Sequence, residues 1–466
     1  MDLAICLASL AVLITLAYRG FSVILIAPLA AMGAVLLTEP AAVAPIYSGL
    51  FMDKLGTFVK LYFPVFLLGA TFGKLIELSG AARAIVSRVT LILGAKNAIL
   101  AIAAVGMVLT YGGVSVFVVV FATYPFAAEM FRRANIPKRL IPATIAFSAF
   151  TITMDALPGT PQIQNIIPTT FFRTDAYAAP WLGMAAATFT TVLCLLYLEW
   201  QRRRAADRGE GYGSGHSNEP ESMADGTSMP AMLAALPLII VAISNRALLT
   251  LINHNYAEKV VALLDPQRGP ANAISQDLKA NAALWAVQGA LLLGIVATIV
   301  IGWASIRNRL EEASKVAVAG SLLASMNTAS EYGFGAVIAA LPGFRQMADF
   351  LMSVRDPLLN QAITVNVLSG LTGSASGGLS LTLGAFADRF VAAASAEGIP
   401  LEVMHRIASL ASGGMDTLPH NGAIITLLAV TGMTHKQAYK DIFVITIIKT
   451  VTVFFAIAVY RASGLV

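Results

Sequence analysis

Apolar segments long enough to cross a lipid bilayer constrain this chain more than any other feature of its sequence. The clearest are residues 3–18, 21–38, 61–76, 179–200 and 281–305, and a membrane helix needs ~18 such residues. Only 12% of the residues are charged, about half the share in an ordinary soluble domain. In lipid every backbone polar group must be paired, and a helix pairs its own. The sequence therefore predicts an all-α polytopic membrane protein.

The basic residues, which give the chain a net charge of +5, lie in short loops between these segments. Loops of this kind orient membrane helices by the positive-inside rule, so the charge predicts no nucleic-acid partner. The first segment has no basic region before it and no small-residue cleavage site after it, and we expect it to be retained as a helix. We expect a multi-pass protein of the bacterial inner (cytoplasmic) membrane, surrounded by the lipid bilayer.

A polar, Gly/Ser-rich stretch over residues 201–230 is typical of a flexible linker. It separates a first half, residues 1–200, from a second half, residues 231–466. The sequence MDALP at residues 154–158 recurs as MDTLP at residues 415–419, and YGGVS at residues 111–115 corresponds to TGSAS at residues 372–376. Both pairs are offset by 261 residues, since 416 − 155 = 373 − 112 = 261. Two matches at one offset indicate an internal duplication.

Each half is predicted to contain about five spans plus a re-entrant hairpin and one broken helix. The hairpins would be residues 98–131 and 358–390, and the broken spans residues 140–169 and 403–430. An odd number of crossings in each half makes the two halves inverted repeats. With the N-terminus outside, the inner loops hold more of the Lys and Arg residues than the outer loops, as the positive-inside rule requires.

Two polar segments interrupt the apolar pattern and are called here the first break (residues 153–165) and the second break (residues 412–421). Pro158 and Pro161 flank Gly159 in the first, and Gly413, Gly414 and Pro419 lie in the second. Interior proline cannot continue a helix, and the freed amides of half-helices hold anions. Corresponding interruptions of this kind point to a transporter binding site. Predicted substrate contacts are Gly159, Thr160, Gln162, Asn165, Thr417, His420 and Asn421; the alternative is ordinary proline kinks packed against neighbouring helices.

The tips of the two predicted hairpins are also small and polar. Glycine and serine allow a backbone to approach a ligand closely, and tight packing of small residues between helices is the alternative explanation. We predict substrate contacts at Tyr111, Gly112, Gly113 and Ser115 in the first tip and at Thr372, Gly373, Ser374 and Ser376 in the second.

Ionisable residues at membrane depth are functional candidates. Asp155 and Asp416, with His420 close to the latter, are predicted to carry protons; helix capping by the two aspartates is the alternative. Glu331 and Arg246 also lie in apolar segments, where an interhelical ion pair explains them as well as function does.

No enzyme signature, cofactor fingerprint or metal-ligand spacing is recognisable, and there is no nucleotide-binding P-loop. The sequence therefore predicts neither an enzyme nor an ATP-driven pump, and no cofactor or metal.

At several of these residues the chain resembles the gluconate permease (GntP) family of the ion-transporter superfamily. The resemblance includes FGKLI at residues 72–76 with SGAA at 79–82, the Tyr111 tip, the Pro158–Pro161 break, the Gly373–Gly378 tip and the Asp416–Asn421 break. It implies inverted repeats with re-entrant hairpins, uptake of sugar acids or small hydroxy acids with protons, and a homodimer that moves by an elevator motion.

Gluconate-type members differ from this chain at two positions: Gly112 replaces an acidic residue, and Asp416 precedes rather than follows a histidine. With few further polar groups in the predicted cavity, these differences favour a short hydroxy-monocarboxylate over gluconate. We thus expect a secondary transporter that imports a small organic anion with protons. A sodium-coupled symporter on the same fold and a passive anion channel are the alternatives.

Overall fold

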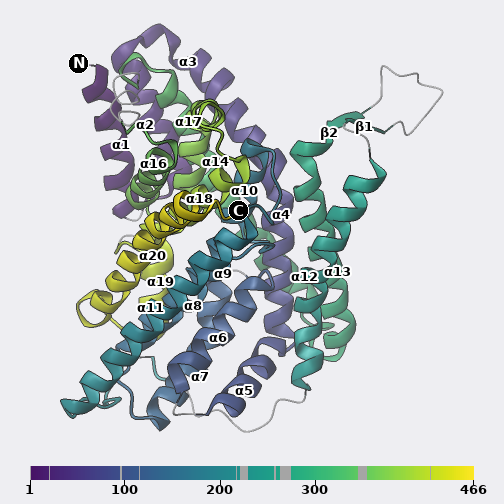
Figure 1. Ribbon diagram of the computed structural model, residues 1–466, viewed down its shortest axis with the longest axis vertical. Helices are drawn as coiled ribbons and strands as arrows, with labels where there is room; N and C mark the ends of the chain where they lie inside the picture. The colour runs from purple at the N-terminus through teal and green to yellow at the C-terminus, as the bar shows by residue number, and fades with distance from the viewer. Residues whose placement is uncertain are drawn as a thin grey trace.

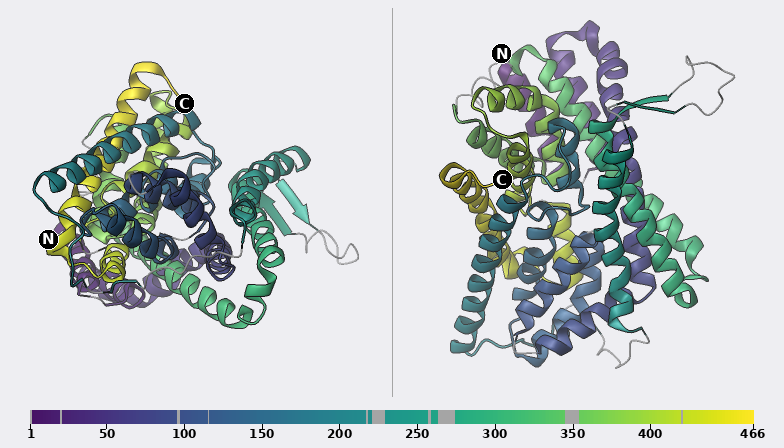
Figure 2. Two further views of the ribbon diagram at one scale, coloured as in Figure 1. Left: turned by 90° about the horizontal axis from the view of Figure 1, so that it is seen from below. Right: turned by 45° about the vertical axis from the view of Figure 1, so that its right-hand side comes forward.

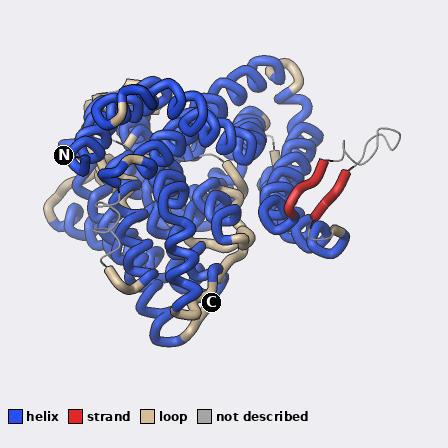
Figure 3. Tube along the Cα trace, turned by 90° about the horizontal axis from the view of Figure 1, so that it is seen from above, coloured by secondary structure: helices blue, strands red, loops and turns tan. Residues whose placement is uncertain are grey.

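The computed structural model describes residues 2–19, 21–94, 97–114, 116–216, 218–220, 229–256, 259–262, 274–344, 354–419 and 421–466. Nearly all of them are helical (Figures 1 and 3). The helices of the first half are α1 (Asp2–Tyr18), α2 (Val23–Thr38), α3 (Val43–Pro45), α4 (Met52–Leu78), α5 (Ala81–Leu93), α6 (Ala98–Tyr111), α7 (Val116–Arg133), α8 (Leu140–Ala149), α9 (Ile152–Asp155), α10 (Ile163–Phe172) and α11 (Pro180–Asp207), with short η1 (Pro40–Ala42) and η2 (Ile46–Phe51) before α4.

The second half adds one small sheet. Strands β1 (Lys259–Ala262) and β2 (Ile274–Asp277) are antiparallel, with Lys259 opposite Asp277, and they project from the side of the molecule (Figure 1). The helices are α12 (Ala231–Asn255), α13 (Leu278–Ile306), α14 (Leu310–Ala340), α16 (Pro357–Thr372), α17 (Ala375–Ala396), α18 (Leu401–Gly414), α19 (Gly422–Thr431) and α20 (His435–Ser463).

The order of the helices repeats between the halves. The long helix α4 corresponds to α14, the hairpin α6–α7 to α16–α17, and the interrupted helices α8–α10 to α18–α19. Helices α8 and α18 begin at Leu140 and Leu401, 261 residues apart. The first hairpin (α6–α7) and the second hairpin (α16–α17) lie toward opposite ends of the long axis (Figures 1 and 2). The duplication predicted from two short motifs thus extends to the order of the elements, while the inverted relation stays a prediction.

Five stretches of helix in the described part of the chain are long and apolar enough to cross a membrane: Pro40–Leu78, Pro180–Asp207, Ala231–Asn255, Asn281–Ile306 and His435–Ser463. The two predicted N-terminal spans are α1 and α2, which are apolar and shorter. Large apolar side chains are exposed on the outward faces of these helices, among them Leu29, Leu196 and Val300. Such surfaces suit lipid rather than water, and every apolar segment predicted from the sequence is helical.

Small residues allow the long helices to approach one another. Helix α4 packs along α13 and α14, and α12 packs along α13 at one side of the molecule (Figure 2). A side chain added at Gly294 in α13 would meet Phe72 of α4, and one added at Gly333 in α14 would meet Phe51. Phe72 and Phe334 are fully buried in the resulting core.

The predicted linker is structured where it can be described. Helix α11 continues through residues 201–207, which were expected to be flexible, so this part of the prediction is wrong. Beyond it, Glu219 forms ion pairs with Arg132 and Lys138, each at 2.6 Å. Glu210 accepts hydrogen bonds of 2.7 and 3.0 Å from Arg139, and these bonds lower the pKa of its carboxyl group below the ordinary value. Residues 217 and 221–228 lie outside the described residues.

Candidate functional site

The first break is present and its backbone is held by its own side chains. Helix α9 ends at Asp155 and α10 begins at Ile163, and Gly159 between them has a φ of +79°, which disfavours other residues. Thr160 Oγ1 donates to the carbonyl of Thr153 at 2.7 Å. Asn165 Nδ2 donates to the carbonyls of Thr160 and Ala176 at 3.0 and 2.8 Å. Side chains predicted to bind substrate therefore also pair the carbonyls that the interruption frees.

The second break lies between Gly414, the end of α18, and Gly422, the start of α19. Asn421 caps α19, because its Oδ1 accepts from the amides of Ala423 and Ile424 at 2.6 and 3.3 Å. Its Nδ2 donates to the carbonyl of Asp416. The cap is thus Asn421 and not Asp416, which removes the capping explanation for that aspartate. Thr417 Oγ1 lies 2.7 Å from Thr446 Oγ1 on α20.

The two breaks meet in the interior of the protein. Ser409 Oγ on α18 donates to the carbonyl of Asp155 at 2.8 Å. Arg406, on the same helix, donates from Nη1 to the Asp155 carbonyl at 3.2 Å and to Asn165 Oδ1 at 3.0 Å. Gly413 lies directly against the Asp155 carboxylate, and a methyl group there would overlap it. Segments about 250 residues apart in the sequence are therefore hydrogen-bonded to each other in the interior.

Two buried cations stand beside the two buried aspartates. Lys449 Nζ on α20 lies 2.5 Å from Asp416 Oδ1, and both side chains are buried. Arg406 is fully buried and also donates from Nε and Nη2 to the carbonyl of Ala178 at 3.1 and 2.7 Å. Sequence reasoning missed both cations, although Lys449 is the one charged residue in the apolar stretch 442–460, which is the signal that marks functional candidates.

The first hairpin tip is bonded to the first break. Tyr111 Oη donates to the carbonyl of Pro158 at 3.0 Å. Gln162 Nε2 donates to the carbonyls of Thr110 and Val114 at 2.8 and 3.2 Å. A side chain on Gly113, whose φ is +91°, would meet Pro161, and one on Gly112 would overlap Leu238 of α12. The structure thus brings these predicted residues together; Ser115 lies outside the described residues.

The second tip uses its polar side chains differently. Thr372 Oγ1 bonds to the carbonyl of Leu368 at 2.9 Å, and Gly373 ends α16 with a φ of +65°. Ser374 Oγ caps α17 by accepting from the amide of Gly377 at 3.0 Å, and Ser376 Oγ lies 3.3 Å from Thr328 Oγ1 on α14. These hydroxyl groups therefore bond within the second hairpin or to α14, and none of the recorded bonds reaches a break. The tip nevertheless packs on the second break, since a side chain on Gly370 would lie 3.0 Å from Met415 Cβ.

Three further predicted residues have separate outcomes. His420 lies outside the described residues. The guanidinium of Arg246 lies 4.9 Å from the ring centre of Tyr177, which is a cation–π contact. Glu331 has no ion-pair partner within the part of the chain that the structure describes.

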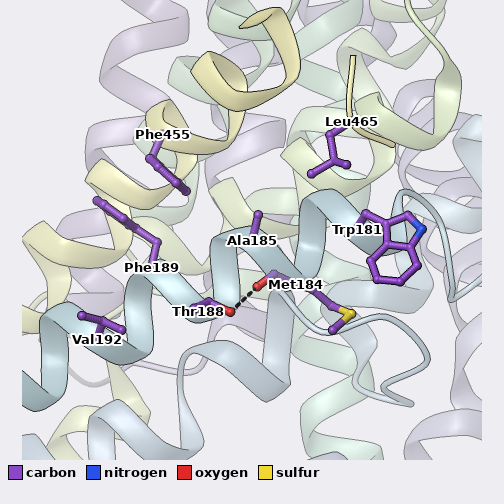
Figure 4. A pocket seen from close by; sticks show the side chains of 8 residues that line it. All are labelled: Trp181, Met184, Ala185, Thr188, Phe189, Val192, Phe455 and Leu465. Carbon is purple, nitrogen blue, oxygen red and sulfur yellow. Dashed lines mark hydrogen bonds between the residues drawn. The ribbon is translucent and has the colours of Figure 1, made fainter. Parts of the chain in front are cut away.

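Two surface cavities are lined by none of the predicted site residues. One, of about 520 Å³, lies along α11 beside Phe455 and Leu465 (Figure 4). Its lining is almost entirely carbon, with Phe189 stacked on Phe455 at 4.0 Å, and it suits an acyl chain rather than an anion. The other, of about 290 Å³, is polar and is lined by charged side chains at the end of α11 and the start of α20.

Known proteins resemble this chain in sequence and in fold. The sequence model of the family described as GntP family permease matches residues 1–275 of this chain. The chain is 52% identical over 479 residues to the transporter YxjC of Bacillus subtilis, covering 100% of each protein. Among solved structures it resembles the YdaH transporter of Alcanivorax borkumensis, with a TM-score of 0.53 and 16% identity over 92% of this chain and 90% of that one.

A second solved structure is similar to a comparable degree. MtrF of Neisseria gonorrhoeae, described as illuminating a class of antimetabolite efflux pumps, matches with a TM-score of 0.50 and 13% identity, over 91% of this chain and 85% of that one. At such identities the two structures show the fold alone.

Proposed function

This chain belongs to the GntP permease family and is a multi-pass membrane transporter rather than an enzyme, and we propose that it imports a small organic anion together with protons. Gluconate or a short hydroxy-monocarboxylate is the proposed substrate, with the shorter acid favoured. The observation that carries the proposal is the meeting of the two breaks, with Asp155 and Asp416 beside Arg406 and Lys449. A buried group of four charges is costly to build, and membrane proteins maintain such groups where ions or substrates pass.

The balance of charge supports coupling to protons. Two carboxylates and two basic side chains compensate one another when all four are ionised. A carboxylate substrate adds one uncompensated negative charge, which is expensive in a site shielded from water. A proton on Asp155 or Asp416 restores the balance, so that anion and proton enter together at least cost. Charge compensation in the buried site therefore requires about one proton for each monocarboxylate that enters.

The first break and first hairpin offer polar groups for the substrate. Helix α10 begins after Gln162 without a side-chain cap, and free amides at a helix start attract carboxylates. The hydroxyl oxygens of Thr110 and Thr153 are buried and have no hydrogen-bond partner. Unpaired buried polar atoms cost free energy unless a ligand or water satisfies them. We therefore assign the substrate contacts of this conformation to the first break and the first hairpin tip. The second hairpin tip would contact the substrate in another conformation, in which its serines lie closer to the breaks.

We further propose the setting in which transport takes place. The repeated element order and the placement of the two hairpins at opposite ends support two inverted repeats. Members of the wider superfamily suggest a homodimer in the bacterial inner membrane, with each protomer moving its hairpins and breaks as one body. Crosslinking of the purified protein in lipid nanodiscs tests the dimer.

Two measurements on the purified protein test the function. A thermal-shift screen against gluconate, 3-hydroxybutyrate and other small acids should show stabilisation of roughly 2 kcal/mol at tens of Kd for the true substrate. Uptake of that acid into proteoliposomes should then be driven by an inward proton gradient in sodium-free buffer. Accumulation only with a sodium gradient would replace the proton as the driving ion, and equilibration without accumulation would indicate a channel.

A further inference from the structure

The polar cavity of about 290 Å³ at the end of α11 and the start of α20 has no part in the proposed transport site. Its lining contains five basic side chains, Arg139, Arg204, Arg208, Lys436 and Lys440. The acidic residues in the same lining are Glu210 and Asp441. The lining therefore carries a net charge of 5 − 2 = +3, and a concave surface of one sign concentrates ions of the other.

The two acidic side chains of this cavity are already used within the protein. Arg139 donates to the two carboxylate oxygens of Glu210 at 2.7 and 3.0 Å and to Asp441 Oδ2 at 2.7 Å. Asp441 Oδ1 accepts from Tyr197 Oη and from Gln201 Nε2, each at 2.7 Å. All four carboxylate oxygens are therefore occupied, and their bonds join the end of α11 to the start of α20.

The other four bases form no ion pair with any carboxylate among the described residues. Arg204 lies over the ring of Trp200 at 5.1 Å, a cation–π contact that positions the guanidinium without neutralising it. Basic residues are favoured at the end of a helix, which explains Arg204 and Arg208 in part. The same principle disfavours Lys436, because α20 begins at His435 and a helix start is itself positive. Helix chemistry alone therefore does not explain this group of cations.

The length of α11 places the cavity at the depth of lipid headgroups. The helix has 28 residues and is therefore about 42 Å long, whereas the hydrocarbon of a bilayer is ~30 Å thick. Its apolar sequence ends at Leu198. Trp200, which follows, is 49% exposed and belongs to a residue type that gathers at the membrane–water interface. The bases of α11 come within the next turns and so lie beside the headgroups.

We propose that this cavity binds the phosphate group of an anionic phospholipid. A phosphate diester carries one negative charge and several acceptor oxygens, which suit Arg and Lys side chains from two helices. The volume is at the low end of small-molecule pockets and suits a headgroup whose acyl chains stay in the bilayer. A soluble phosphate shares this chemistry, but the depth of the cavity favours the lipid. The site goes beyond the proposed function, and the lipid would hold α11 to α20, the helix that carries Lys449.

Lipid binding can be measured without substrate or transport. The full-length protein is stripped of lipid in an uncharged detergent, and its melting temperature is followed as phosphatidylglycerol is added to the micelles. We expect a saturable rise of roughly 2 to 4 °C, and a much smaller rise with phosphatidylcholine of the same acyl chains. Sodium phosphate at the same phosphate concentration should cause no such rise. The double variant Arg204→Gln/Lys440→Gln should raise the lipid fraction at half-effect by about tenfold or more.

Arg203→Gln/Lys315→Gln is the matched control, because it removes the same two residue types at exposed positions that do not line the cavity. It should respond to phosphatidylglycerol as the wild type does, since exposed ion pairs contribute little. Native mass spectrometry should find phosphatidylglycerol bound to the wild type and to the control and absent from Arg204→Gln/Lys440→Gln.

Three results would overturn the assignment: equal responses to the two lipids, a wild-type response in Arg204→Gln/Lys440→Gln, or an equal loss in the control. A rise with sodium phosphate equal to that with phosphatidylglycerol would replace the lipid by a soluble phosphate. None of these readouts depends on which acid is transported or on whether protons drive transport.

Discussion

Lys449 Nζ on α20 lies 2.5 Å from Asp416 Oδ1 in the second break, and both side chains are almost entirely removed from the surface. This ion pair ties the last helix of the chain to the segment where α18 is interrupted. An aspartate that was identified from a repeated motif therefore has a partner that the motif does not contain. This pair and the contact of Gly413 with Asp155 hold the two breaks and α20 together.

Removing the lysine should destabilise the protein strongly. Lys449→Met leaves Asp416 buried without its partner, and breaking a buried pair in this way costs about 3–5 kcal/mol. Lys440→Met, at an exposed position on the same helix, should change little. Unfolding in detergent measures both variants. The double variant Lys449→Met/Asp416→Leu should recover much of the loss, and simple additivity of the two changes would argue against the pair.

The close contact between the breaks predicts a steric effect at one glycine. A methyl group at Gly413 overlaps the Asp155 carboxylate, whereas one at Gly422 meets no atom within 4 Å. Gly413→Ala should cost about 1–3 kcal/mol, as overpacking of a core does, and should reduce substrate uptake. Gly422→Ala serves as the control and should behave as the wild type. Equal stability and uptake in the two variants would mean that the breaks do not touch in solution.

One bond between the first hairpin tip and the first break comes from a hydroxyl group that can be removed without touching the bonds of Gln162. Tyr111→Phe deletes the 3.0 Å bond to the carbonyl of Pro158, at an expected cost of about 1 kcal/mol. We expect a larger effect on the KM for uptake, because the tip is a predicted substrate contact. Tyr47→Phe, at an exposed position, is the control. An unchanged KM in Tyr111→Phe would separate the tip from the substrate.

The segment after α11 should respond to acid through Glu210. Hydrogen bonds from Arg139 lower the pKa of Glu210 in the folded protein from its ordinary value of 4.5. The contribution of this carboxylate to stability is therefore present above pH ~4.5 and is lost as the pH falls through the lower, folded-state pKa. The difference in melting temperature between wild type and Glu210→Gln should shrink as the pH falls from 7 toward 4. A difference that grows on acidification would contradict the sign of the shift.

The sequence predicts the helical spans and the breaks because both depend on local chemistry. Apolar length fixes the spans. Pro158 and Pro161 lie between α9 and α10, where two prolines three residues apart disfavour a continuous helix, and Gly414 is the last residue of α18. The repeat was recognisable because MDALP and MDTLP share one offset with the hairpin tips. Helices α8 and α18 keep that offset in the structure.

The partners of these residues could not be predicted in the same way. Arg406 reaches Asp155 across 251 residues, and Lys449 reaches Asp416 from another helix; such contacts depend on tertiary packing that no local pattern encodes. The helical continuation through residues 201–207 was missed because Arg and Ala favour helices even where the composition is polar. Tertiary bonds to Arg139 and Lys138 then hold the segment that follows.

Proton coupling at the meeting of the two breaks is the central claim, and Asp416→Asn tests it most directly. In proteoliposomes loaded with the identified acid, uptake driven by a pH gradient and exchange of external for internal acid are measured on the same preparation. The account predicts that Asp416→Asn loses gradient-driven accumulation and keeps exchange, while Asp388→Asn, at an exposed position on α17, keeps both. Gradient-driven accumulation at the wild-type level in Asp416→Asn would contradict it.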